Sequence, residues 1–170
     1  IIVTLRNLSI NAVGTGTDGV RLTSGGRLIL ENVTISGVTR YGVWVPTQTT
    51  AGGVVISNSS ITSGAEGVRT AHSITTVSNS VISGNSGFGL IAEGNGIINA
   101  DGNTISNNGT GLQAGNASGV GQANATVNIS NNNIYGNVNG MGCGGGIIAS
   151  DGSNRTGNNS AMPCTPTGTI

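Results

Sequence analysis

Residues 78–90 read SNSVISGNSGFGL, and similar phrases flank them, SNSSITSGAEGV at 57–68 and GNTISNNGTGL at 102–112. Each phrase contains an isoleucine and, a few residues later, Gly-Val or Gly-Leu. The isoleucine recurs at intervals of 21 to 29 residues, at Ile10, Ile35, Ile61, Ile82, Ile105 and Ile134. Self-similarity at such a period indicates a repeat protein in which each unit buries its apolar face against its neighbours.

The residues before each isoleucine alternate in polarity. The positions five and seven residues earlier are aliphatic in eleven of twelve cases, with Thr75 as the exception. The position between them is mixed and reads Thr4, Ile29, Val55, Thr76, Asn99 and Asn128. Alternation with a period of two indicates a strand with one buried face, and no unit contains the run of about 10 to 12 residues that a helix needs.

Turns rich in Gly, Asn and Ser divide each unit into three short strands, which suits one turn of a parallel β-helix with coils stacked ~4.8 Å apart. Equivalent residues then form columns along the axis. One column at the first bend consists of asparagines, Asn7, Asn32, Asn58, Asn79 and Asn131, with Gly102 in the one gap. Asn tolerates the left-handed backbone of a sharp corner, and its amide can bond the coils on either side. We therefore expect a structural asparagine ladder at this bend.

These phrases resemble the degenerate repeats of the pectate-lyase-like superfamily of right-handed parallel β-helices, and more narrowly those of uncharacterised secreted bacterial repeat proteins. The resemblance covers nearly the whole chain. It implies an all-β, right-handed solenoid of about seven coils of three short strands. It does not imply one activity, because the superfamily includes lyases, hydrolases, adhesins and phage spikes.

Polysaccharide lyases and hydrolases of this superfamily work on the face formed by the first strand of each coil, with clustered carboxylates, Ca²⁺ or basic residues. The matching outward row in this chain, which we extend to Ile148, contains no acid and no base. Its aliphatic residues instead indicate a contact surface for another protein chain, through Ile29, Val55 and Ile98. Ordinary β-propensity on a half-exposed strand explains them equally well.

A single domain is expected over residues 1–170, with coils as far as residue 148 and a C-terminal coil or cap over residues 149–170. No cap is recognisable before Ile1, so we expect further residues to precede it. Cys143 and Cys164 are 21 residues apart, about one coil, so stacking would bring their Cα atoms within the ~4.4–6.8 Å that a disulfide needs. A disulfide that clamps the last coil is favoured over two free thiols, and it agrees with a secreted or cell-surface location.

The third strands of the first coils carry the most varied outward side chains. One row reads Arg21, Trp44 and Arg69, the row before it reads Asp18, Tyr41 and Glu66, and His72 lies nearby. Aromatic rings stack on sugar rings while carboxylate and guanidinium groups bind hydroxyls, so these residues predict a sugar-binding patch. The alternative is a surface ladder of ion pairs and cation–π contacts, each worth ~1 kcal/mol or less. A third possibility is acid–base catalysis by Asp18 and Glu66, which two coils would separate by ~9–10 Å, at the upper limit for an inverting glycosidase.

The outward rows of the second strand consist largely of Ser and Thr, a pattern that resembles ice-binding surfaces, although Val81 and Tyr135 interrupt it. The chain has no lysine, six scattered arginines and a formal net charge of zero, which argues against a nucleic-acid partner. No apolar run approaches the roughly 18–20 residues of a transmembrane helix. Nothing in the sequence calls for a metal or a cofactor.

The leading hypothesis is a non-catalytic extracellular β-helix module, adhesin-like or carbohydrate-contacting. Two longer connections, residues 46–52 and 115–124, contain no charged residue and favour neutral sugars or proteins as partners over acidic polymers. The alternatives are a polysaccharide lyase or glycoside hydrolase, and an ice-binding protein.

Overall fold

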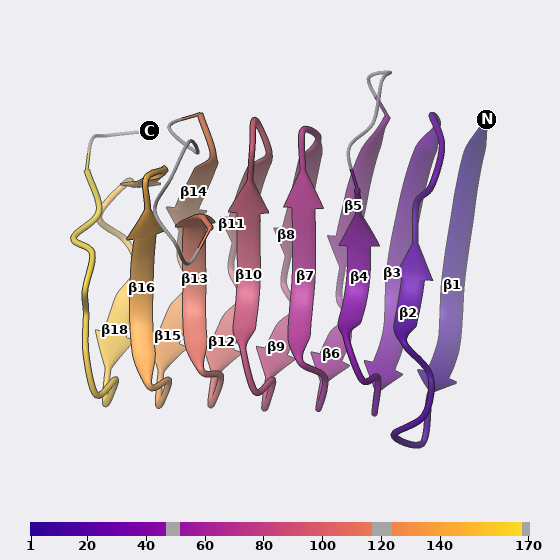
Figure 1. Ribbon diagram of the computed structural model, residues 1–170, viewed down its shortest axis with the longest axis horizontal. Coiled ribbons are helices and arrows are strands. Elements are labelled where there is room, and N and C mark those ends of the chain that lie inside the picture. The colour runs from indigo at the N-terminus through magenta and orange to yellow at the C-terminus, as the bar shows by residue number, and fades with distance from the viewer. Residues whose placement is uncertain (47–51, 117–123, 168–170) are drawn as a thin grey trace.

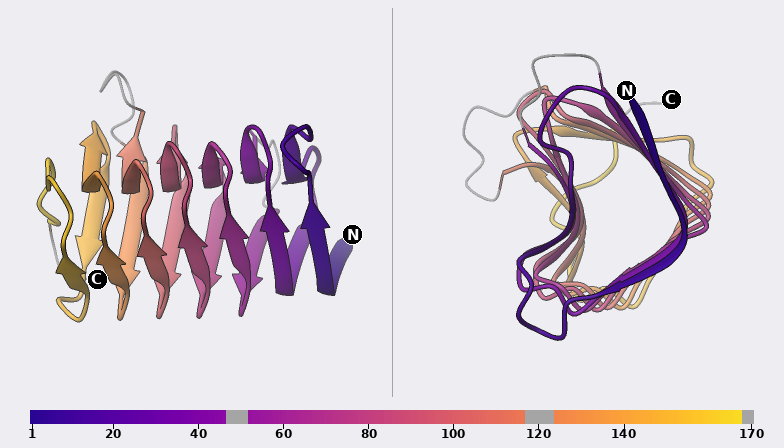
Figure 2. Two further views of the ribbon diagram at one scale, coloured as in Figure 1. Left: turned by 90° about the horizontal axis from the view of Figure 1, so that it is seen from below. Right: turned by 90° about the vertical axis from the view of Figure 1, so that its right-hand side faces the viewer.

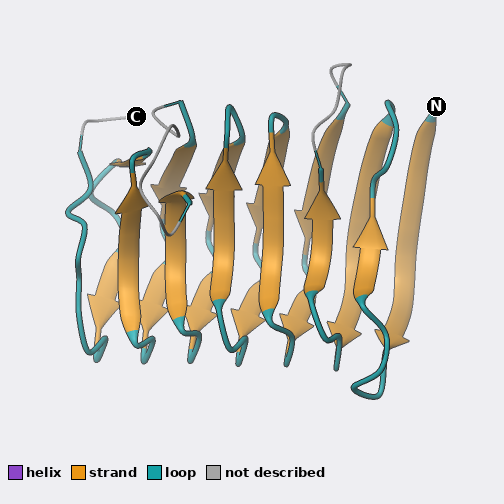
Figure 3. Cartoon of the chain, in the orientation of Figure 1, coloured by secondary structure: helices purple, strands orange, loops and turns teal. Residues whose placement is uncertain are grey.

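The computed structural model describes residues 1–46, 52–116 and 124–167, in which the chain forms strands and turns only. The strands wind into a solenoid whose coils lie side by side along one axis (Figure 1). Short turns join the strands at the corners (Figure 3). The pairings between the named strands of the described residues are all parallel, as the repeat predicts. The described part holds no helix of the length and apolarity needed to cross a membrane.

Each of the first six coils contributes one segment to each of three faces. The first-strand face consists of the N-terminal halves of β1 (Ile2–Asn11) and β3 (Arg27–Ser36), then β5 (Gly53–Ser57), β8 (Ile74–Ser78), β11 (Ile97–Asp101), β14 (Thr126–Ser130) and β17 (Ile147–Ser150). The second-strand face consists of the C-terminal halves of β1 and β3, then β6 (Ser60–Thr62), β9 (Val81–Ser83), β12 (Thr104–Ser106), β15 (Asn133–Tyr135) and β18 (Arg155–Gly157). The third-strand face consists of β2 (Asp18–Arg21), β4 (Tyr41–Val45), β7 (Glu66–Ala71), β10 (Phe88–Glu93), β13 (Thr110–Gly115) and β16 (Asn139–Gly144).

Six coils are complete in the described residues, and the seventh contributes β17 and β18 before the chain turns across the end of the solenoid. Viewed down the axis, the coils superpose as one closed outline (Figure 2). The count agrees with the expectation of about seven coils.

The interior is a continuous aliphatic core. The repeated isoleucine of each coil is buried from the second coil onward, with Ile61, Ile82 and Ile105 at most 1% exposed. The Gly-Val phrase lies beside it, and a Cβ at Gly42 would lie only 2.6 Å from the carbonyl oxygen of Gly67 in the next coil. Glycine at this position therefore allows the third strands to approach the core closely.

The asparagine column occupies the first corner with left-handed backbone. Its five asparagines have φ between 48° and 55°, and Gly102 has φ 66° at the equivalent position. The side chains are exposed, and the Asn32 amide donates to Asn7 Oδ1 over 2.8 Å. The column thus turns the chain at the surface of the solenoid.

Two further polar ladders lie inside the corners and were not anticipated from the sequence. The first-corner ladder consists of Ser59, Ser80, Asn103, Asn132 and Asn154. The second-corner ladder consists of Asn85, Asn108, Asn137 and Asn159. In both, a side-chain oxygen accepts the backbone N–H of the preceding coil. Asn108, which is 2% exposed, accepts from Asn85 N over 3.1 Å and donates to Ile82 O over 3.1 Å.

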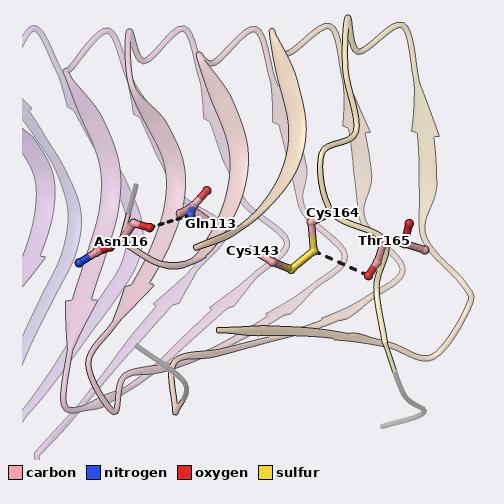
Figure 4. Close-up of a disulfide and its surroundings, with 5 residues drawn as sticks. All are labelled: Gln113, Asn116, Cys143, Cys164 and Thr165. Carbon is pink, nitrogen blue, oxygen red and sulfur yellow. Dashed lines mark hydrogen bonds between the residues drawn. A yellow bond between two sulfur atoms is a disulfide. The ribbon is translucent and has the colours of Figure 1, made fainter. Parts of the chain in front are cut away.

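The C-terminal end is closed by a disulfide between Cys143 and Cys164, with a Cα–Cα distance of 5.4 Å (Figure 4). Cys164 packs into the core, and the tail around it pairs with the last coils. Gly140 N donates to Ala161 O, and Thr167 N donates to Ile148 O, both over 2.8 Å. The expected disulfide is confirmed, and it holds this tail against the open end of the core.

Candidate functional site

Three consecutive third strands bring the predicted patch residues into two rows. The β2, β4 and β7 strands pair so that Tyr41 lies between Asp18 and Glu66, and Trp44 lies between Arg21 and Arg69. These strands run side by side at the N-terminal half of the third-strand face (Figure 1). We call the six residues, together with Arg40 and Glu93, the aromatic patch.

Arg69 is the centre of the aromatic patch. Its Nη1 donates to Glu66 Oε1 over 2.9 Å, and its Nε and Nη2 donate to Glu93 Oε2 over 3.0 and 2.5 Å. The guanidinium carbon lies 5.3 Å from the ring centroids of both Tyr41 and Trp44. Two carboxylates thus fix the cation against two aromatic rings, a geometry that favours cation–π attraction.

The two rings also contact one another, and a second cation covers one of them. The Tyr41 and Trp44 centroids are 5.1 Å apart with an interplanar angle of 35°. The Arg40 guanidinium lies 4.6 Å from the Tyr41 centroid. Both rings are half-buried. The patch is therefore a preassembled aromatic platform.

Asp18 balances the remaining cations. Its carboxylate lies 3.8 Å from both Arg21 and Arg40, and its side chain is 10% exposed. Its Oδ1 is buried and accepts no hydrogen bond from the described residues. The patch contains three arginines and three carboxylates, so its formal charge is zero.

Burial and neighbouring charges shift the pKa values of the central ion pair, Glu66 and Arg69, in opposite directions. Burial raises the pKa of Glu66, although the neighbouring Arg69 opposes the shift. Burial alone would lower the pKa of Arg69, but Glu66 and Glu93 together raise it. Glu66 is therefore a desolvated carboxylate held in place by a cation that stays charged.

The two carboxylates considered as a catalytic pair have another side chain between them. Asp18 and Glu66 are two coils apart, as the sequence predicts, and Tyr41 stands between them in the same row. Each carboxylate also faces at least one arginine. This arrangement suits a binding platform flanked by hydrogen-bond donors and acceptors. It suits acid–base catalysis less well, because that needs a water molecule between the two carboxyl groups.

Some patch residues were predicted and others were not. His72 lies at the third corner with φ 55°, against Gly94 of the next coil, and is not part of the contacts that join Tyr41, Trp44 and Arg69. Glu93 was missed, although it lies two residues after Ile91, which pairs with Arg69. Arg40 precedes its strand and had no signal beyond its place next to Tyr41.

The first-strand face requires two corrections. Ile98 and Ile148 were expected to face outward, but both are fully buried in the core. The outward residues at these points are Ile97 and Ala149, because Ile98 pairs with Val127, which in turn pairs with Ile148. A shift of one residue in a strand reverses the face of every side chain. The corrected aliphatic surface includes Ile29 and Val55, which are half-buried, with Ile74 and Ile97 beside them.

The second-strand face has the expected rows of Ser and Thr in register. Val81 and Tyr135 are exposed on this face, and Arg155 ends one row. Ice binding by this face stays a prediction. The two uncharged connections lie largely outside the described residues, so their expected role in binding also stays a prediction.

Within residues 1–46, 52–116 and 124–167, no three His, Cys, Asp or Glu side chains gather closely enough to hold a metal ion.

A family model described as "right handed beta helix region" matches residues 3–163, nearly the whole chain. Comparison with curated proteins and with solved structures finds no match. The match agrees with the parallel coils and with the handedness that the repeat phrases imply.

Proposed function

Since the chain belongs to the right-handed β-helix family, whose shared fold does not fix an activity, we propose that it is a non-catalytic extracellular module that contacts neutral carbohydrate through the aromatic patch. The observation that carries the proposal is the arrangement of Tyr41 and Trp44 around Arg69, with both rings half-buried and fixed in place. Preorganised aromatic surfaces bind sugar rings at little cost in conformational entropy.

The charge of the aromatic patch supports a neutral ligand. Arg69 already binds Glu66 and Glu93, and Arg21 and Arg40 both face Asp18. An acidic polysaccharide would have to compete with these carboxylates for each guanidinium. A neutral sugar can instead use the remaining donor and acceptor positions while one face of the ring stacks.

The location and a second contact surface belong to the same proposal. The Cys143–Cys164 disulfide supports an oxidising, extracellular setting. The aliphatic side chains Ile29, Val55, Ile74 and Ile97 support contact between the first-strand face and another protein chain.

One observation favours an enzymatic alternative. Glu66 is desolvated and its pKa is raised, as is common for a general acid. A polysaccharide lyase or glycoside hydrolase that uses Glu66 would release unsaturated or reducing products from a glycan. Products that disappear in Glu66→Gln would replace the non-catalytic proposal with this one.

Retention of the protein on immobilised polysaccharide tests the binding proposal. We expect a neutral glucan, xylan or galactan to retain the wild-type protein, and Trp44→Ala to weaken retention about tenfold or more. Trp44→Phe should keep most of it, and Tyr135→Ala, an exposed aromatic on the second-strand face, should leave it unchanged. Equal retention of Trp44→Ala and wild type, or stronger retention on polygalacturonate than on every neutral polymer, would refute the proposal.

A further inference from the structure

The first-strand face presents three outward columns that run the length of the solenoid. The upstream column reads Ile2, Arg27, Gly53, Ile74, Ile97, Thr126 and Ile147. The central column reads Thr4, Ile29, Val55, Thr76, Asn99, Asn128 and Ala149. The downstream column reads Arg6, Glu31, Ser57, Ser78, Asp101, Ser130 and Asp151.

The upstream column exposes large apolar side chains at both ends and in the middle. Ile2, Ile74 and Ile147 are 68%, 53% and 46% exposed, and Ile97 stacks on Ile74. Three of the most exposed aliphatic residues of the described chain thus share one column. Isolated exposed aliphatics are ordinary, but a column of them on a flat sheet is typical of a contact surface.

Charge on this face is separated along the axis. Both arginines, Arg6 and Arg27, lie in the first two coils, where Glu31 pairs with Arg6 over 2.7 Å. Asp101 and Asp151 lie in the fifth and seventh coils. Hydrogen bonds from Ser130 and Asn131 lower the pKa of Asp101, and hydrogen bonds from Ser153 lower that of Asp151, so both stay ionised. The third and fourth coils carry no charge on this face.

We propose that two copies of this chain pack their first-strand faces together with antiparallel axes, so that the fourth coil of each copy lies over the fourth coil of the other. The inference rests on the second contact surface proposed above and names its partner. A two-fold axis along the strands keeps each column opposite itself and reverses its order. The two sheets then pack with aligned strands about 10 Å apart.

This register matches apolar side chains in the upstream column and charges in the downstream column. Arg6 of each copy faces Asp151 of the other, so two ion pairs form across the interface. Ile2 faces Ile147, and the two Ile74 side chains meet at the two-fold axis. In the upstream column apolar side chains therefore face apolar or small ones, and each charge of the face lies opposite an opposite charge or a polar group. In the central column Ile29 and Val55 face Asn128 and Asn99.

Other arrangements of the same two faces are worse. Sliding one copy by one coil sets Glu31 opposite Asp101 or Asp151, and like charges in contact cost several kcal/mol in an interface. Parallel axes set Ile97 and Ile147 opposite those aspartates, which would lose their water without a partner. Parallel axes would also set Arg27 of each copy opposite Glu31 of the other, but the two aspartates left against aliphatic side chains favour the antiparallel register.

The size of the face predicts a weak dimer. Seven strands of about five residues cover roughly 30 Å by 15 Å, so the pair buries about 1,000 Å², just below the ~1,200–2,000 Å² of stable complexes. We expect a dissociation constant in the micromolar range.

Sedimentation equilibrium over a concentration series tests the proposal, with the native disulfide intact. The wild type should convert from monomer to dimer as its concentration rises, and Ile74→Lys should remain a monomer. Val81→Lys, which alters an exposed aliphatic on the second-strand face, should dimerise like the wild type. A wild type that stays monomeric at millimolar concentration, or an Ile74→Lys protein that dimerises normally, would overturn the proposal.

A charge swap tests the antiparallel register and does not depend on one variant folding well. Arg6→Asp and Asp151→Arg should each weaken dimerisation about tenfold, and the double variant should recover most of the loss. A double variant that is weaker than both single variants would contradict the register. Glycan retention of Ile74→Lys should equal that of the wild type, so failure of the dimer and failure of the aromatic patch give separate results.

Discussion

The N-terminal and C-terminal halves of the solenoid share one backbone but differ in what fills their corners and covers their third-strand face. In the first two coils the corner interiors are aliphatic. Leu8 and Val33 occupy the first-corner position that Asn132 has in a later coil, and Val38 occupies the second-corner position of Asn137. The same N-terminal coils carry the aromatic patch, whereas the third-strand row ends in Gln113 and Gly142.

The difference teaches that the stabilising contacts and the proposed binding surface occupy different coils along the axis. A buried asparagine satisfies the backbone groups of adjacent coils and leaves the outward side chains of its own coil unconstrained. The disulfide and the buried asparagines of the two corner ladders lie toward the C-terminus, and the ring and charge contacts lie toward the N-terminus. We infer that the C-terminal coils act mainly as scaffold.

The largest expected effect comes from breaking a buried ladder. Asn108→Ala removes the acceptor of Asn85 N–H, which is left buried without that partner, and also removes the side-chain donor to Ile82 O. We expect a loss of about 2–4 kcal/mol in the free energy of unfolding, against about 1–2 kcal/mol for Val38→Ala at the equivalent corner of the second coil. Urea unfolding measures both values.

Asn133→Ala is the matched control for this comparison, since Asn133 lies on the outward side of β15 and should change stability by no more than about 0.5 kcal/mol. If Asn108→Ala costs no more than Asn133→Ala, the ladders do not stabilise the C-terminal coils as described.

A smaller expected effect is that pH changes the free energy of unfolding in opposite directions through one carboxylate of each half. Burial raises the pKa of Glu66 above its unfolded value near 4.5, so its contribution to stability increases as the pH falls through the raised pKa. Hydrogen bonds lower the pKa of Asp101 below 3.8, so its contribution is present above that value and is lost as the pH falls through the lowered pKa. Acidification should therefore stabilise wild type relative to Glu66→Gln and destabilise it relative to Asp101→Asn. Urea unfolding between about pH 7 and pH 3 measures the two differences, and equal pH profiles for all three proteins would contradict the assignment.

The sequence predicted the parts of the molecule that follow from one repeated register. The isoleucine spacing placed the core, the strand rows and the cysteine pair, because each depends only on the position of a residue within its coil. Ile98 was placed outward although its position marks it as a core residue, and its neighbour Ile97 has the same side chain. Asn132 was missed for a related reason, since Asn131 next to it is the same residue type on the opposite side of the backbone.

The contacts of the aromatic patch could be predicted only in part. The rows of Trp44 and Tyr41 follow from strand register, and the structure has them as expected. The reach of Glu93 across one coil to Arg69 depends on rotamers that no spacing specifies.

The most direct test of this division is chemical-shift mapping of the isotope-labelled wild-type protein during titration with the neutral oligosaccharide that retains it best. The largest amide shifts should fall in β2, β4 and β7, and the amides of β13 and β16 should stay unchanged. Shifts concentrated in β13 and β16, or no shifts at saturating oligosaccharide, would contradict a binding surface in the N-terminal coils.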